Sequence, residues 1–357
     1  MPLDLTASAA DITRAICDIP SESGSEAHLA DLIEEAMRDR EHLEVIREGN
    51  TIVARTNLGR AQRVAIAGHI DTVPINGNVP TRDVEIDGVP MIWGRGTVDM
   101  KAGVAVQLKL AAELVDPAVD ITWMWYDNEE VEAARNGLKL LAESRPELFR
   151  ADFAILGEPS NGEVEGGCNG TLRAVVRTTG VRAHSARAWI GENAIHRAAP
   201  ILARLAEYRP REIAVDGLEY REGLNAVRIS GGIAGNVIPD LCEVEVNYRF
   251  APSKSAADAE AHVRNVFAGF TVEITDVAEG ARPGLDAPIA QEFVAAVGAT
   301  PKPKYGWTDV ARFSALGIPA VNYGPGDPHL AHHDEERVPI AQITATEQGL
   351  RSWLRGV

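Results

Sequence analysis

The sequence predicts an α/β catalytic domain with a mixed, helix-covered sheet, into which a smaller α+β domain is inserted. Apolar runs alternate with helical spacing in the first half, the pattern changes after about Gly170, and the first pattern returns near the C-terminus. Alternation of strands and helices is typical of a sheet whose faces are covered by helices. The length of 357 residues also favours two domains.

The first half predicts three short, buried strands separated by helices. Apolar residues recur at helical spacing in four segments, 6–17, 25–39, 100–115 and 131–143. Short apolar runs predict strands at Arg63–Ala67, Ile121–Tyr126 and Asp152–Leu156. Each of these runs is followed by polar residues, which makes the strand ends the first place to search for a site.

The middle of the chain predicts a separate sandwich of about a hundred residues. The predicted strands are 171–179, 225–232, 241–250 and 271–276, and the predicted helices are 191–207 and 255–267. An Arg-Pro-Gly linker at 282–284 precedes a strand at Ile318–Asn322 and a helix at 339–354. We therefore expect a discontinuous catalytic domain, 1–171 and 283–357, and an inserted domain, 172–282.

Composition excludes several classes of function. The 52 acidic residues exceed the 35 basic ones, and the net charge of −17 disfavours nucleic acid and anionic membranes as partners. No segment has the ~18 apolar residues of a membrane span, and the N-terminus lacks the pattern of a secretory signal. The three cysteines are scattered, as in a reducing compartment, so we expect a cytoplasmic protein.

Two motifs near the first predicted strand contain candidate metal ligands. In Gly68–Pro74 (GHIDTVP), His69 and Asp71 share one face of an extended chain, which suits a ligand with a supporting carboxylate. A loop histidine beside a turn-forming aspartate is the alternative. In 94–101 (GRGTVDMK), Asp99 directly precedes a predicted helix, so it is either a ligand or a helix-capping acid.

Three further clusters carry acids or histidines. Glu129 and Glu130 follow the second strand, where one could bind metal while the other faces an attacking water, or both could simply favour a helix start. Glu158 follows the third strand in a Gly-Glu-Pro-Ser motif. His332, in the late sequence AHHDEE, is either a ligand or part of a polar surface loop.

Taken together, these clusters favour a metal-dependent hydrolase. Nitrogen and oxygen ligands without thiolate are typical of catalytic zinc. The sequence has no GxSxG nucleophile motif, no phosphate-binding GxxxxGK[ST] loop and no GxGxxG fingerprint. A glycosidase could use paired carboxylates, but it would leave His69 and His332 without a role.

The five motifs, in this order, resemble those of the metallopeptidase family that contains desuccinylases, acetylornithine deacetylases, aminoacylases and carboxypeptidases. The resemblance spans nearly the whole chain and implies two zinc ions per subunit, with cobalt as a possible substitute. It implies that His69 and Glu158 hold one ion, that Glu130 and His332 hold the other, and that Asp99 bridges them. His332 is preferred to His333 because it lies four residues before a glutamate.

The same resemblance assigns the remaining catalytic residues. It implies that Glu129 is the general base and that Asp71 supports His69. Asn128 stands where many relatives have aspartate. The inserted segment resembles the family's lid and dimerisation domain, which implies a homodimer. His184 is expected to reach the partner's active site and stabilise an oxyanion.

The choice of substrate follows from a finer resemblance, to the desuccinylase branch of the family. This implies hydrolysis of N-succinyl-L,L-diaminopimelate, with another N-acyl amino acid or a dipeptide as the alternative substrate. The implied substrate contacts are Arg249, Asn236, Thr171 and Gly326. An arginine fork suits a substrate carboxylate, whereas a strand-end ion pair is the alternative role for Arg249. Cys168 stands where some relatives carry arginine. A non-catalytic metal-binding protein is the alternative class.

Overall fold

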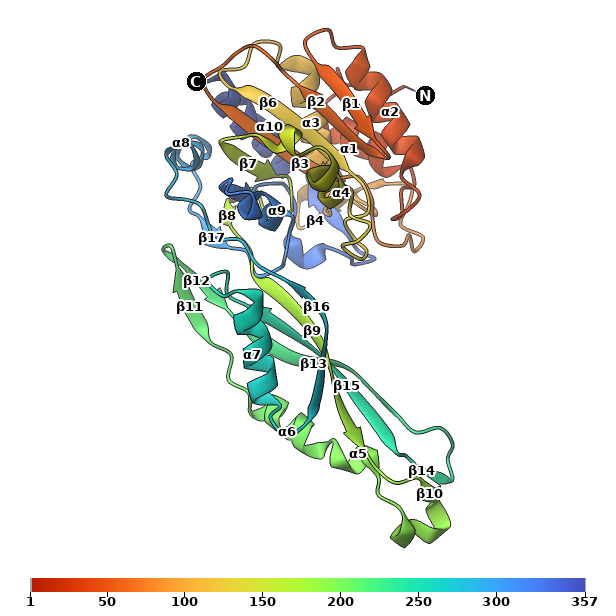
Figure 1. Cartoon of the computed structure of the whole chain (residues 1–357). Helices are drawn as coiled ribbons and strands as arrows, with labels where there is room; N and C mark the ends of the chain where they lie inside the picture. Colours follow the sequence, from red (N-terminus) through yellow and green to blue (C-terminus); the bar gives the residue numbers. More distant parts are fainter. Residues whose placement is uncertain (1, 357) are drawn as a thin grey trace. The chain divides into compact units, whose positions relative to one another are not determined.

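The computed structural model describes residues 2–356, and the chain forms two compact units (Figure 1). The first unit contains the chain up to Gly166, together with Pro283–Lys302 and the chain from Arg312 onward. The second unit contains Gly167–Arg282 and Pro303–Ala311. A discontinuous unit therefore surrounds an inserted one in the sequence.

The boundaries differ from the expected ones in two places. The first division falls before Gly167 rather than after residue 171, because an isolated bridge joins Cys168 to Ala281 within the second unit. Pro303–Ala311, expected in the catalytic domain, also groups with the second unit. Trp307 there donates a hydrogen bond from Nε1 to the carbonyl of Glu279, at 3.0 Å.

The first unit is built on an eight-stranded sheet with the order β1-β2-β6-β3-β7-β18-β8-β17. Its strands are β1 (Glu44–Glu48), β2 (Thr51–Arg55), β3 (Arg63–His69), β6 (Asp120–Tyr126), β7 (Phe153–Leu156), β8 (Glu165–Gly166), β17 (Lys302–Pro303) and β18 (Ala320–Asn322). Strand β3 is parallel to β6 and β7, and β18 is parallel to β7. The pairs β1–β2, β2–β6 and β8–β18 are antiparallel, which confirms the predicted mixed sheet.

The parallel strands at the centre of this sheet are buried on both faces. Every residue of β6 is buried, and so is every residue of β3 except Arg63. Strands covered on both faces have continuous apolar runs rather than alternating ones, which is why their sequences were recognisable. Helix α3 packs against β3 and contacts α1 and α10.

The helices of the first unit largely follow the predicted segments. They are α1 (Ala9–Cys17), α2 (Ala27–Arg38), α3 (Lys101–Glu113), α4 (Gly137–Ser144), α8 (Pro288–Val297), α9 (Val310–Ala315) and α10 (Ile340–Arg355), with 3-10 turns η1 (Pro146–Phe149) and η3 (Pro328–Leu330). The prediction of a helix over 131–143 was wrong in its first half, because α4 begins only at Gly137. Asn136 caps it by accepting the N–H of Lys139 at 2.9 Å.

A small three-stranded sheet, β19-β5-β4, lies in the same unit and was not predicted. Its strands are β4 (Arg82–Ile86), β5 (Val89–Trp93) and β19 (Arg337–Pro339). Strand β5 immediately precedes the Gly-Arg-Gly segment, and β19 immediately follows Glu336. Their antiparallel pairing, with Arg337 opposite Trp93, brings two distant sequence motifs together.

The second unit has an antiparallel sheet, β13-β15-β9-β16, flanked by helices. Its elements are β9 (Gly170–Thr179), β10 (Ala183–His184), η2 (Ser185–Ile190), α5 (Ala194–Arg197), α6 (Ala199–Glu207), β11 (Glu212–Val215), β12 (Leu218–Arg221), β13 (Gly223–Gly231), β14 (Val237–Ile238), β15 (Leu241–Phe250), α7 (Ala256–Val266) and β16 (Thr271–Ala278). Burial alternates along β15, as expected for a sheet with one face on the core. The predicted helix 191–207 is divided at Ala198, next to a proline in the first turn of α6.

Within residues 2–356, no helix is both long enough and apolar enough to cross a bilayer.

Candidate metal centre and active site

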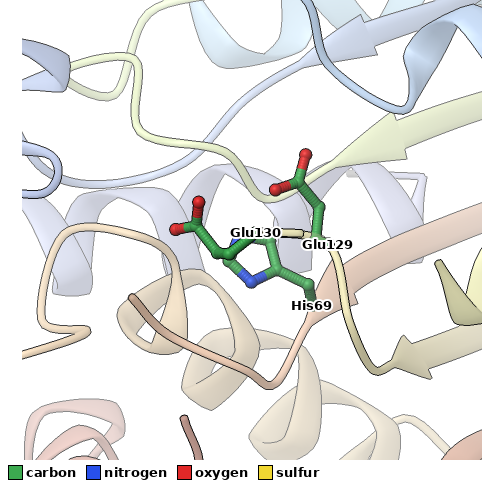
Figure 2. A group of neighbouring side chains, drawn as sticks. All are labelled: His69, Glu129 and Glu130. Atoms are coloured by element: carbon green, nitrogen blue, oxygen red, sulfur yellow. The ribbon is translucent and has the colours of Figure 1, made fainter. Parts of the chain in front are cut away.

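The candidate ligands meet where the parallel strands of the large sheet end. His69 is the last residue of β3 and lies opposite Tyr126, the last residue of β6. Glu129 and Glu130 lie on the loop that follows β6, and Glu158 lies just after β7. Parallel neighbours present their carboxyl ends at one edge, so residues far apart in sequence become neighbours in space. Figure 2 shows His69 together with the two glutamates.

Two groups of possible ligand atoms share one carboxylate. His69, Asp99 and Glu158 form the first group, and Asp99, Glu130 and His332 form the second, with the atoms of each group within 4.8 Å of one another. Nε2 of His69 lies 3.1 Å from Oδ1 of Asp99, and Nε2 of His332 lies 3.3 Å from Oδ2 of the same carboxylate. Asp99 therefore presents one oxygen to each group.

The chemistry of this donor set fits divalent cations. Each group offers one imidazole nitrogen and two carboxylates, the donor types that zinc and similar ions use in catalytic sites. Glu129 adds a further carboxylate, since it lies within 4.8 Å of the donor atoms of both His69 and Glu130. The described residues thus place several candidate ligands for a divalent cation together.

The two histidines are strongly influenced by the surrounding carboxylates. Hydrogen bonds with Asp99 and with Glu130 raise the pKa of His332 to about 10. Burial opposes the charged form of His69, but hydrogen bonds with Asp71 and Asp99 raise the pKa of His69 well above its ordinary value. Binding of a divalent cation would require neutral imidazoles and ionised carboxylates, so protons would compete with it at these positions.

Asp71 holds three of the site residues at once. Its Oδ1 lies 3.4 Å from Nδ1 of His69 and accepts the backbone N–H of Glu129 at 3.0 Å. Its Oδ2 accepts the backbone N–H of Glu130 at 3.1 Å and the hydroxyl of Ser23 at 2.7 Å. Asp71 is fully buried, so its contacts orient both the imidazole and the loop that carries the two glutamates.

Asn128 lies at the start of the loop that carries Glu129 and Glu130. Its φ is 56°, in the left-handed region that asparagine tolerates better than most residues. The side chain donates to Oδ2 of Asp127 at 2.6 Å, and its backbone N–H reaches Oε1 of Glu26 at 3.2 Å. These bonds fix the chain at the start of the loop that carries Glu129 and Glu130.

Glu336 is a buried carboxylate. In the sequence it served only to favour His332 over His333, because it lies four residues after His332. Its Oε1 accepts the backbone N–H groups of Val98 and Asp99 at 2.8 and 2.9 Å. Its Oε2 accepts Nη1 of Arg95 at 3.0 Å. Burial raises the pKa of Glu336 to about 7, although the two backbone donors act in the opposite direction. His333 belongs to none of the ligand groups found in residues 2–356.

The residues expected in the lid lie in the second unit. His184 is exposed at the end of β10, where its Nδ1 accepts the backbone N–H of Ala186 at 3.1 Å. The carbonyl of Asn236 accepts the N–H of Ser185 at 2.9 Å. The two predicted residues, His184 and Asn236, therefore lie close together where β10 pairs with β14. A neutral His184 in this arrangement carries its proton on Nε2.

The other expected substrate contacts are divided between the units. In the second unit, Thr171 and Arg249 are opposite each other on β9 and β15, and each has a hydrogen bond with Asn247, at 3.1 Å. Arg249 takes part in no ion pair among residues 2–356, which disfavours the alternative of a structural salt bridge. In the first unit, Gly326 has a φ of 100°, and an added Cβ would lie 3.0 Å from Val98, next to Asp99.

Comparisons with known proteins agree with this architecture. The chain is 54% identical over 357 residues to a putative succinyl-diaminopimelate desuccinylase of Mycobacterium tuberculosis, covering 99% of this chain and 100% of that one. It is 46% identical to a succinyl-diaminopimelate desuccinylase of Corynebacterium glutamicum, covering 99% and 97%. A tripeptidase structure from Staphylococcus aureus superposes with a TM-score of 0.79 at 21% identity, covering 99% of each chain. The model of peptidase family M20/M25/M40 matches residues 65–355, and the chain belongs to this family of hydrolases.

Proposed function

We propose that the chain is an amide hydrolase that removes succinate from N-succinyl-L,L-diaminopimelate. The observation that carries the reaction type is the pair of ligand groups sharing Asp99, with Glu129 beside them. The choice of substrate is supported by 54% and 46% identity, over nearly full length, to two proteins named as succinyl-diaminopimelate desuccinylases. Membership of the family implies a divalent metal.

We propose two zinc ions as that metal, with cobalt as a substitute. His69 and Glu158 would hold one ion, Glu130 and His332 the other, and Asp99 both. When bound, the ions supply Lewis-acid polarisation of the amide carbonyl and make water a better nucleophile near neutral pH.

Glu129 is the proposed general base. Its carboxylate takes a proton from the water as the oxygen attacks the amide carbon, and it gives a proton to the leaving nitrogen as the C–N bond breaks. Succinate and diaminopimelate are the products. Asp71 supports this role through the backbone N–H of Glu129, whose position it fixes without touching the reacting carboxylate.

His184 is proposed to donate a hydrogen bond from Nε2 to the developing oxyanion in a partner subunit. The bond that Nδ1 accepts from Ala186 favours the tautomer with this donor available. A homodimer is further supported by the large apolar side chains exposed on the second unit, which are Val181, Trp189, Ile190, Ile195, Leu202, Val227, Ile229, Ile233 and Leu241.

Arg249 is the proposed anchor for a carboxylate of the substrate, with Thr171, Asn236 and Gly326 as further contacts. A guanidinium without an acidic partner is chemically suited to a ligand carboxylate. Burial lowers the pKa of Arg249, and the nearby Arg173 lowers it further, but arginine stays charged. We also propose a cytoplasmic location, since Cys17, Cys168 and Cys242 are all buried free thiols.

A comparison of substrates tests the proposed function. The protein, loaded with two equivalents of zinc, is expected to hydrolyse N-succinyl-L,L-diaminopimelate with a kcat/KM at least ~10-fold above that for N-acetylornithine or a simple dipeptide, since unmatched polar groups in a pocket penalise the wrong substrate. The new amino group that each hydrolysis produces is the measurement for all three substrates, and release of succinate identifies the first reaction. A preference for another substrate would discard the desuccinylase assignment while keeping the hydrolase. Metal binding without turnover of any substrate would favour a non-catalytic binding protein.

Complementation between two inactive variants tests the role of His184 across a dimer. A His184→Ala subunit keeps Glu129, and a Glu129→Gln subunit keeps His184, so a mixed dimer restores one complete site. Random mixing in equal amounts is expected to recover about a quarter of the wild-type activity in a two-fold dimer. Each variant re-mixed with itself is the control. Mixed dimers that stay as inactive as these controls would contradict action across the interface.

A further inference from the structure

Two segments far apart in the sequence supply Asp99 and His332, and a buried ion pair joins them. Arg95 lies on the segment that leads to Asp99, and Glu336 lies four positions after His332. Their side chains are 4% and 1% exposed, and Nη1 of Arg95 lies 3.0 Å from Oε2 of Glu336. Both segments are in the first unit, so the ion pair is internal to it.

The contacts run in both directions between the segments. Glu336 accepts the backbone N–H groups of Val98 and Asp99, and its own carbonyl accepts the N–H of Gly94 at 3.0 Å. Arg95 donates to the carbonyl of His333 at 3.2 Å. The N–H of Asp99 and the carbonyl of His333, the residue after His332, are therefore held by one pair of side chains.

We propose that Glu336, clamped by Arg95, is a positioning residue that controls the affinity of the Asp99–Glu130–His332 group for its cation. This inference rests on the proposed two-metal site and adds a residue that touches neither ion nor substrate. His332 is exposed and has a φ of 65°, so its place opposite Asp99 depends on contacts in its own segment.

The Arg95–Glu336 ion pair supports one of the two ligand groups more than the other. His69 and Glu158 are buried at the ends of β3 and β7, and Asp71 orients His69 independently of Glu336. In the second group, the backbone N–H of Asp99 donates a hydrogen bond to Glu336. His332 lies on the same segment as Glu336, four residues before it. Asp99 belongs to both groups, but the second group depends on this ion pair for two ligands, Asp99 and His332, whereas the first keeps His69 and Glu158 at the edge of the sheet. Loss of the ion pair therefore weakens the second group more than the first.

Glu336→Gln is the variant that tests this, because it preserves size but replaces the carboxylate facing Arg95 with a neutral amide. Asp334→Asn is the matched control: Asp334 lies 3.5 Å from Nη2 of the same arginine, its side chain is 60% exposed, and it accepts a hydrogen bond from Nδ2 of Asn76 at 2.8 Å. Metal-free full-length proteins are titrated with zinc by calorimetry. Titration with cobalt, followed by visible absorption, reports the geometry of each ion.

Glu336→Gln is expected to bind one zinc about 10–100-fold more weakly, the usual effect of removing a group that orients a ligand, and to lose clearly less affinity for the other. The cobalt spectrum of the weakened ion is expected to change, and Asp334→Asn to match the wild type in both measurements. Thermal unfolding of the metal-free proteins separates this effect from a general loss of stability. Arg95→Lys keeps the positive charge but loses the forked guanidinium, and it is expected to weaken the binding of the same ion. This variant takes the place of Glu336→Gln in the test if Glu336→Gln does not fold.

Wild-type affinity for both ions in Glu336→Gln, or equal weakening of both, would overturn the inference. The proposed two-metal site, on which the inference rests, fails in a different way: wild-type protein would then bind fewer than two ions, before any variant is considered. The two failures are therefore separated by the wild-type titration alone.

Discussion

Glu129→Gln is expected to lower kcat by about 100-fold or more and to leave metal binding intact. The carboxamide has the size of the carboxylate but cannot accept the proton of the attacking water, and general-base catalysis typically contributes 10²–10⁴-fold. A 100-fold loss corresponds to about 2.7 kcal/mol in the activation free energy. The backbone N–H of Glu129, which Asp71 accepts, is unchanged, so the neighbouring ligand Glu130 keeps its position.

The measurement combines steady-state kinetics with zinc content. Glu132→Gln is the matched control, since Glu132 is an exposed glutamate on the same loop, 3.9 Å from Arg135. We expect it to retain wild-type kcat. Near-normal turnover by Glu129→Gln would disprove the assignment of the base. Loss of zinc together with activity would instead make Glu129 a ligand, which its distance from the donor atoms of His69 and Glu130 also permits.

The sequence predicted the site because its chemistry follows the ends of buried parallel strands. Continuous apolar runs marked β3, β6 and β7, and the polar residues after each run had to converge at one edge of the sheet. The structure brings His69, Glu130 and Glu158 to that edge as expected. His332 could be placed in the site only by resemblance to a family, because nothing local distinguishes it from His333.

Contacts between distant segments could not be predicted. The Arg95–Glu336 pair depends on β5 and β19 being neighbours, and these strands of five and three residues carry no periodic signal of their own. The first half of the helix predicted over 131–143 is absent, and there the N–H of Gly137 donates to the carbonyl of Asp127 at 2.8 Å, which draws the chain back to the end of β6. Tertiary hydrogen bonds outweighed local propensity there.

The second unit contains a buried carboxylate that sequence reasoning passed over. Glu222 lies between β12 and β13, and its side chain is fully buried. It accepts hydrogen bonds from the hydroxyl of Tyr248 at 3.0 Å and from the backbone N–H of Ala251 at 3.1 Å. It also pairs with Lys254 and, at 3.1 Å, with Nε of Arg211. One carboxylate thus joins the β11–β12 hairpin to β15 and to the turn before α7.

Glu222→Gln is expected to destabilise the second unit by about 3 kcal/mol, because removing one partner of a buried ion pair leaves the other charge uncompensated. Hydrogen exchange of the β9 and β15 amides measures the free energy of opening this unit. Glu219→Gln, at an exposed position on β12, is the matched control and should exchange like the wild type. Unchanged protection in Glu222→Gln would show that the network contributes no net stability.

The pH dependence of this difference identifies the charge of Glu222 as its cause. Burial alone would raise the pKa of Glu222, but Lys254 and the N–H of Ala251 lower it below its ordinary value of 4.5. A carboxyl group with a lowered folded-state pKa stabilises the fold above its unfolded pKa and loses that contribution as the pH falls through the folded value. The gap between wild type and Glu222→Gln should therefore be constant near neutral pH and shrink below about pH 4.5. A gap that persists below the folded-state pKa would assign the loss to packing, since the wild-type carboxyl is then neutral, as the amide of the variant is at every pH.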